Sequence, residues 1–161
     1  MSGIKKRKLA IRELEKRLML DASLGALVST TVFAENTVNA SPQILDADVT
    51  ISGTTTNFDG ESLTISTTGG AEDQISINNE GSGAGQIGFD GTNVSYGGTV
   101  IGTISSNGTN GSNLTIDLDS DANQAALERL IENITYQNIS DNPASNRTLN
   151  YSVGALFSEN I

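Results

Sequence analysis

Three aspartates at alternate positions form the first candidate for chemistry in this sequence. Asp117, Asp119 and Asp121 make a D-x-D-x-D pattern, and Glu128 stands twelfth counting from Asp117, as in an EF-hand calcium loop. The sixth position is Ala122, where that loop requires a glycine for its sharp turn. A polar strand that runs into a helix cap therefore explains the pattern better than an EF-hand. The three aspartates are kept as candidate calcium ligands.

Two further oxygen-rich turns are candidates for the same cation, because calcium prefers carboxylate and carbonyl oxygens. The first contains Asn57, Asp59 and Glu61, and the second contains Asp141. Asp-Gly and Asn-Pro pairs are also ordinary turn formers, and this interpretation needs no metal and is favoured. Calcium is the one candidate cofactor. The neighbouring acids Glu72 and Asp73 are predicted to be exposed loop charges.

The composition argues against catalysis. The chain has 161 residues without His, Cys or Trp, so the usual general base and the thiolate nucleophile are both missing. Paired carboxylates could hydrolyse a glycoside, but that mechanism needs a cleft with a defined carboxylate pair, and here the acids fall in turns. Three Tyr and four Phe leave few aromatic side chains for stacking on a sugar. We therefore predict that the chain is not an enzyme, and we assign no catalytic residues.

Charge divides the chain into two parts. Seven of its nine basic residues precede Ala22, whereas most of its 19 acidic residues follow it. The acidic body counts against nucleic-acid binding and suits solubility, cation binding or repulsion between neighbouring modules. Residues 1–40 are predicted to be a basic leader or targeting segment, either flexible or partly helical.

The leader allows more than one interpretation. Residues 4–20 have apolar side chains at helical spacing among Lys and Arg, so membrane contact is conceivable through this basic amphipathic stretch. Residues 24–33 form a modest apolar run, and a small-residue site ending at Ala34 suggests cleavage there. The run is too short and too polar to cross a membrane.

Residues 41–154 are predicted to form the folded module, followed by a tail at 155–161. Short alternating segments separated by glycine-rich turns favour an antiparallel β-sandwich, and Asp90-Gly91 and Gly97-Gly98 mark tight hairpins. Residues 120–133 have helical spacing and predict one short helix, with Leu127 and Leu130 in the core and Asp119 or Ser120 as its cap. A β-solenoid is the alternative, although no fixed-period repeat is visible.

The leader carries a short family resemblance. Residues 14–22 resemble the LEPR-XLL motif found near the N-terminus of very large exported proteins of Gram-negative bacteria, matching at Leu14, Glu15, Arg17, Leu18 and Leu20. The sequence departs from the motif at Lys16, where the family has Pro, and at Met19. The seven positions of the motif, residues 14–20, have little specificity alone. Their value comes from their position near the N-terminus and from a second resemblance in the body of the chain.

The resemblance in the body is longer and covers roughly 100 residues in order and in spacing. The segment NFDGESLTI resembles the opening "DFDGGTLTV" of a module repeated in giant bacterial adhesins with cadherin-like or RTX features. The likeness continues through residues 71–77, 83–88, 131–136, 140–143 and 147–149. It ends at residues 154–161, where such modules continue into an acidic linker, so the number of modules is open.

These resemblances imply an Ig/cadherin-like β-sandwich in a secreted or cell-surface protein. The implied function is that of a stalk or adhesion repeat, stabilised by calcium at its turns. The implied partners are neighbouring modules of the same protein and host or matrix ligands. The alternative is a module that recognises surface glycan or protein through its loops.

Overall fold

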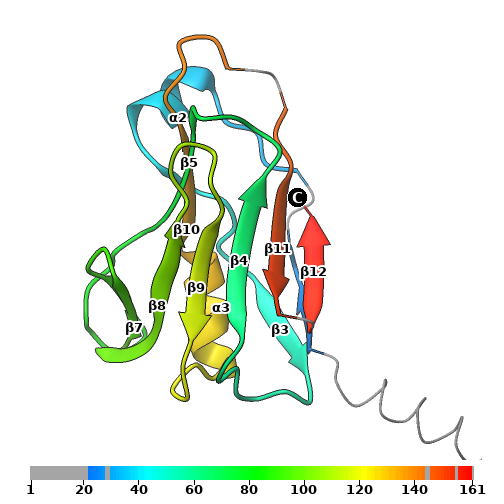
Figure 1. Cartoon of the computed structure of the whole chain (residues 1–161), viewed down its shortest axis with the longest axis vertical. Helices are drawn as coiled ribbons and strands as arrows, with labels where there is room; N and C mark the ends of the chain where they lie inside the picture. Colours follow the sequence, from blue (N-terminus) through cyan, green and yellow to red (C-terminus); the bar gives the residue numbers. More distant parts are fainter. Residues whose placement is uncertain (1–21, 28–29, 144–145, 155, 161) are drawn as a thin grey trace, which may run out of the picture.

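The computed structural model describes residues 22–27, 30–143, 146–154 and 156–160. Within these ranges strands dominate, every strand pair is antiparallel, and two short helices are present, α2 (Glu35–Ala40) and α3 (Gln124–Glu132) (Figure 1). The prediction of a mainly β, antiparallel fold is confirmed. The described residues form neither a closed barrel nor a solenoid. The LEPR-XLL-like positions 14–20 and the basic amphipathic stretch at residues 4–20 lie outside the described residues.

The larger sheet contains seven strands in the described part of the chain. Its order is β12 (Phe157–Asn160), β11 (Leu149–Val153), β4 (Ser62–Thr67), β9 (Leu114–Leu118), β8 (Thr99–Asn107), β7 (Asn93–Tyr96) and β6 (Ile87–Phe89). Alternate side chains of β4, β9 and β11 are buried, because successive residues of a strand point to opposite faces. One face of this sheet therefore builds the core.

The opposing layer consists of α3 and a three-stranded sheet, β2 (Gln43–Ile44), β10 (Ile134–Asn138) and β5 (Asp73–Ile77). Figure 1 shows β10 and α3 behind the larger sheet. The helix buries one stripe made of Ala126, Leu127, Leu130 and Ile131, which confirms the two leucines as core residues. Fully buried side chains from both layers, among them Phe58 and Tyr151, fill the space between them.

A small sheet of β1 (Ala22–Gly25) and β3 (Thr50–Gly53) completes the described strands. Ala22 and Leu24 of β1 belong to the buried core, as does Val38 of α2. Backbone pairing therefore crosses the boundaries drawn from the sequence: β1 pairs with β3 across residue 40, and β12 pairs with β11 across residue 154. Among the described residues, no helix combines the length and apolarity needed to cross a membrane.

Both hairpins predicted from the Asp-Gly and Gly-Gly dipeptides are present. The turn at Asp90-Gly91 joins β6 to β7, and the turn at Gly97-Gly98 joins β7 to β8. Gly97 and Gly98 have φ of 59° and 86°, the left-handed conformation that a two-residue type I′ turn requires at both positions.

The start of α3 differs from the prediction. The helix begins at Gln124, and its N-cap is Asn123, whose side chain accepts a hydrogen bond from the Ala126 backbone N–H. Neither Asp119 nor Ser120 caps it, because a separate turn at residues 119–122 comes between β9 and the helix. Any of these polar residues could cap a helix, so their order in the sequence does not identify the one that does.

Candidate functional site

Six of the seven predicted calcium ligands lie at one end of the molecule, below β4 and β9 in Figure 1. Residues 57–61 lead into β4, and residues 117–121 comprise the end of β9 and the turn that follows it. The two segments are joined by backbone hydrogen bonds of 2.9 Å from Phe58 N to the Ala122 carbonyl and from Leu118 N to the Glu61 carbonyl. We call residues 57–61 and 117–121 together the acidic pole. The seventh candidate, Asp141, lies in the loop after β10 at the opposite end.

The polar side chains of the acidic pole are hydrogen-bonded to the turns themselves. Asn57 accepts from the Asp59 backbone N–H at 2.9 Å and donates to the Ser120 carbonyl at 2.7 Å. Asp119 accepts from the backbone N–H two residues ahead, at 2.9 Å. The bonds from Asp59 to Asn57 and from Asp121 to Asp119 are Asx-type turn bonds, whereas the bond from Asn57 to Ser120 links the two segments.

The aspartate at the end of β9 bonds across the sheet. Asp117 Oδ1 accepts from the hydroxyl of Ser62, its partner on β4, at 2.7 Å. Within the part of the chain that the structure describes, no three His, Cys, Asp or Glu side chains are grouped so that they could hold a metal ion. The candidate ligands are therefore brought to one end without being gathered around one point.

The opposite end contains a polar cluster of a different kind, centred on Asp73 at the start of β5. The Asp73 side chain is 0% exposed, and Oδ1 accepts from the Tyr136 hydroxyl at 2.6 Å and from the Asn138 amide at 2.7 Å. Arg147 donates from Nε to Asp73 Oδ2 at 2.8 Å and from Nη2 to Glu72 at 2.8 Å. We call Asp73, Tyr136, Asn138 and Arg147 the Asp73 network.

Burial sets the electrostatics of this network. Loss of solvent, followed by the hydrogen bond to Asp73, raises the pKa of Tyr136 to about 12, so its phenol is a donor at neutral pH. Burial opposes the charge of Arg147, but the hydrogen bonds and the charge of Asp73 outweigh that effect and raise its pKa. An arginine that is 11% exposed thus pairs with a fully buried carboxylate.

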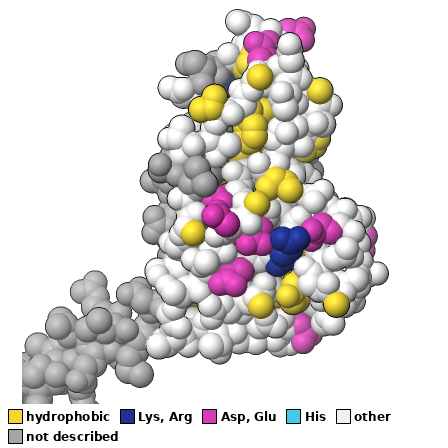
Figure 2. Space-filling model, turned by 180° about the vertical axis from the view of Figure 1, so that it is seen from behind, with side chains coloured by type: hydrophobic (Ala, Val, Ile, Leu, Met, Phe, Trp, Pro, Cys, Tyr) yellow, Lys and Arg dark blue, Asp and Glu magenta, His cyan; other side chains and the backbone are white. Residues whose placement is uncertain are grey.

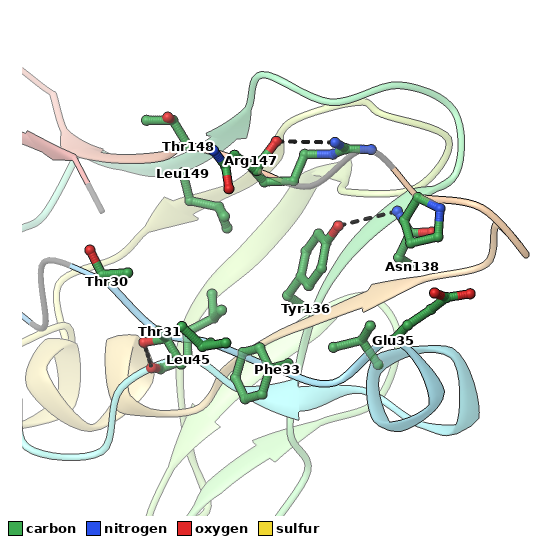
Figure 3. A pocket seen from close by; sticks show the side chains of 14 residues that line it. Thr30, Thr31, Phe33, Glu35, Leu45, Tyr136, Asn138, Arg147, Thr148 and Leu149 are labelled. Atoms are coloured by element: carbon green, nitrogen blue, oxygen red, sulfur yellow. Dashed lines mark hydrogen bonds between the residues drawn. The ribbon is translucent and has the colours of Figure 1, made fainter.

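The network borders a hollow of about 640 Å³. Figure 3 shows Arg147 and Leu149 on one side of it, Phe33 and Leu45 on the other, and Tyr136 between them. Most of its lining comes from residues 30–38, from Pro143 and from residues 146–149, and it combines apolar and polar groups. Thr31 secures the nearer segment by donating to the Leu45 carbonyl at 3.3 Å.

The prediction that Asp73 is an exposed loop charge is wrong. Asp73, Ile75 and Ile77 occupy alternate positions of β5 and all are buried. The alternation of the strand, extended two residues backward from Ile75, places Asp73 on the inward face. A buried carboxylate requires a cationic or hydrogen-bonding partner, and the later part of the chain offers only two arginines.

The interactions of the Asp73 network mainly hold segments of the fold together. Its carboxylate accepts from three side chains, its phenol is held protonated, and its guanidinium is paired with two acids. The network ties β5 and β10 of the smaller sheet to the segment that leads into β11 of the larger one. Comparisons with protein-family models, with curated proteins and with solved structures find no match to this chain.

Proposed function

We propose that this chain is a structural or adhesive module of an exported bacterial surface protein, acting as a stalk or adhesion repeat. Its fold is proposed to be an Ig/cadherin-like antiparallel β-sandwich. One observation carries the proposal. Three of the segments that resemble adhesin repeats, residues 71–77, 131–136 and 147–149, supply Asp73, Tyr136 and Arg147 to a single buried network.

Because these residues come together in one network, we infer that Asp73, Tyr136 and Arg147 have a mechanical role. A buried ion pair with complete hydrogen bonding fixes the relative position of the segments it joins, because breaking it leaves a charge without solvent. The Asp73 network joins the two layers at one end of the molecule. A module that transmits tension needs such cross-links between its layers.

The charge of the body is consistent with a series of modules. The described residues contain only Arg129 and Arg147 as cations among many acids, so neighbouring copies would repel unless chain connectivity held them together. Figure 2 shows acidic side chains exceeding basic ones on the face behind the larger sheet, with apolar side chains in small separate groups. The proposed partners are accordingly neighbouring modules of the same protein.

Surface exposure can be tested directly. Antibodies against the full chain are expected to label intact cells of the bacterium that produces it, and protease added outside should remove the label. Labelling that requires permeabilised cells would contradict an exported surface protein.

The mechanical role needs a separate measurement. The full chain held between two handles is stretched by force spectroscopy, comparing wild type, Arg147→Ala and Arg129→Ala. Arg129 is the matched control because it also pairs with two acids, Glu80 and Glu132, but lies on the outer side of α3 and is 38% exposed. Arg147→Ala is expected to lower the unfolding force markedly and Arg129→Ala to leave it nearly unchanged. Equal forces in the two variants would remove the mechanical argument.

A ligand-binding module is the second candidate, and the hollow beside Tyr136 and Arg147 favours it. Its mixed lining suits a small ligand that has both apolar and polar groups. A screen of glycans and short peptides should then give a binder that Phe33→Ala weakens. If no binder has an affinity that depends on Phe33, the ligand-binding proposal is rejected and the structural module is the remaining proposal.

A further inference from the structure

We propose that β1 is an exchangeable strand: the edge of β3 with which it pairs can also pair with β1 of a second copy of this chain. This inference does not depend on the proposed function. It rests on how β1 is attached, how β3 is supported, and where backbone strain lies between β1 and the rest of the fold.

The backbone pairing of β1 is short and involves β3 alone among the described strands, although β12 also lies near it. Four residue pairs join it to β3, from Ala22 opposite Gly53 to Gly25 opposite Thr50. One side-chain contact accompanies them, between the hydroxyls of Ser23 and Ser52 at 2.9 Å. The side chains that β1 buries are those of Ala22 and Leu24, which are a small part of the core.

The position of β3 does not depend on β1. The other edge of β3 is held by α3: the Ile51 backbone N–H donates to Glu128 Oε1 at 2.7 Å, and the Ile51 carbonyl accepts from the amide of Gln124. The Ile51 side chain is itself in the core. If β1 leaves, β3 therefore remains anchored and presents an open backbone edge, the kind of edge that recruits another strand.

Strain lies at the point where β1 joins the body. Ala26, the residue directly after β1, has φ of 60°, a left-handed conformation that residues with a Cβ seldom adopt. The described residues between β1 and α2 form no helix or strand. Opening of β1 would relieve Ala26, and strained hinges of this kind promote exchange of an element between identical chains.

The occupant is another β1 because its residues match this edge of β3. Leu24 lies opposite Ile51, and Gly25 lies where a Cβ would come within 2.9 Å of the Thr50 hydroxyl oxygen. A strand with an apolar residue followed by glycine at these two positions fits, and every copy of the chain has one.

The experiment uses two full-length variants, Ser23→Cys and Ser52→Cys, in a chain that has no native cysteine. The variants carry different mass labels, and they are mixed and then oxidised gently in two arms. In the first arm the folded proteins are incubated together, and in the second they are refolded together from denaturant. A disulfide between the two chains requires β1 of one copy to lie on β3 of the other, because the sulfur atoms must come within bonding distance.

Cross-linked heterodimer is expected in both arms at several times the yield of a control mixture of Ser23→Cys with Thr103→Cys. Thr103 is exposed on β8, away from β3, so this control measures random collisions. Adding Ala26→Gly to both chains should lower the yield, because glycine removes the strain that favours opening. Yield no higher than the control in both arms, or a yield that Ala26→Gly leaves unchanged, would overturn the proposal.

Discussion

At one end of the molecule the carboxylate of Asp73 is fully buried and accepts hydrogen bonds from Tyr136, Asn138 and Arg147. At the other end the acids of residues 57–61 and 117–121 reach solvent, and the side chains of Asn57, Asp117 and Asp119 bond to their own turns or to the facing segment. The same residue types thus form a buried ion pair in one place and solvent-exposed hydrogen bonds in the other. The difference is burial, since an interior charge has no water to replace a lost partner.

The largest expected effect is at the Asp73 network. Asp73→Ala leaves the guanidinium of Arg147 without its buried partner, and removing one member of a buried pair costs about 3–5 kcal/mol in the free energy of unfolding. Urea denaturation of the full chain measures this change. The matched control is Asp59→Ala at the acidic pole, where a loss of about 0.5 kcal/mol or less is expected because the side chain is exposed. Similar losses in the two variants would erase the contrast between the ends.

Alkaline pH should weaken the same end. The pKa of Tyr136 is raised to about 12 in the folded protein from its ordinary value of 10.0, so folding favours the protonated phenol. The stability that this shift contributes is complete below pH 10 and is lost as the pH rises through 12.

Urea denaturation at intervals from pH 8 to about pH 11.5 tests this dependence. Tyr136→Phe is expected to cost about 1–3 kcal/mol at pH 8, since it removes a hydrogen bond to a charged group. It should also flatten the decline above pH 10. Burial raises the pKa of Tyr151 as well, so part of the decline should persist in this variant. A decline of unchanged steepness in Tyr136→Phe would show that its phenol is not the titrating group.

A smaller effect is expected from Asn57, the best-connected side chain of the acidic pole. Asn57→Ala removes two hydrogen bonds, one to the Ser120 carbonyl and one from the Asp59 backbone N–H, at a cost of about 1–2 kcal/mol. Asn57→Asp keeps the acceptor and should retain about half of that stability. Thermal unfolding compares the variants, and a loss as large as that of Asp73→Ala would contradict the view that burial makes the Asp73 network the stronger of the two.

The smallest effect is expected from calcium. The described acids of the pole are not grouped around one point, so millimolar calcium should move the melting temperature by less than about 1 °C relative to EDTA. Differential scanning fluorimetry measures the shift. A rise of several degrees that Asp119→Asn and Asp121→Asn abolish would instead establish a calcium site at the pole.

The sequence predicts the local structure of this chain better than its polar partnerships. The dipeptides Asp90-Gly91 and Gly97-Gly98 identify both hairpins, because these signals act within a few residues. The stripe that contains Leu127 and Leu130 identifies α3 in the same way, although its cap proved to be Asn123.

Contacts between distant residues are not visible in the sequence. Asp73 and Arg147 are 74 positions apart, and their pairing depends on how two sheets stack. The same limit applies to β1: its four residues lie within the segment predicted to be a leader, and their partner strand β3 comes later in the chain. The acidic pole is the intermediate case, because strand topology brings its two segments together but the described acids do not converge on one point.

If the adhesin-like segments hold the fold together through the Asp73 network, Asp73 and Arg147 must be energetically coupled. A double-mutant cycle measures that coupling from the free energy of unfolding of wild type, Asp73→Ala, Arg147→Ala and the double variant. We predict that the double variant loses much less than the two single losses combined, with a coupling energy of about 2 kcal/mol or more. Losses that add within about 0.5 kcal/mol would contradict the cohesive role of the network, because independent residues behave that way.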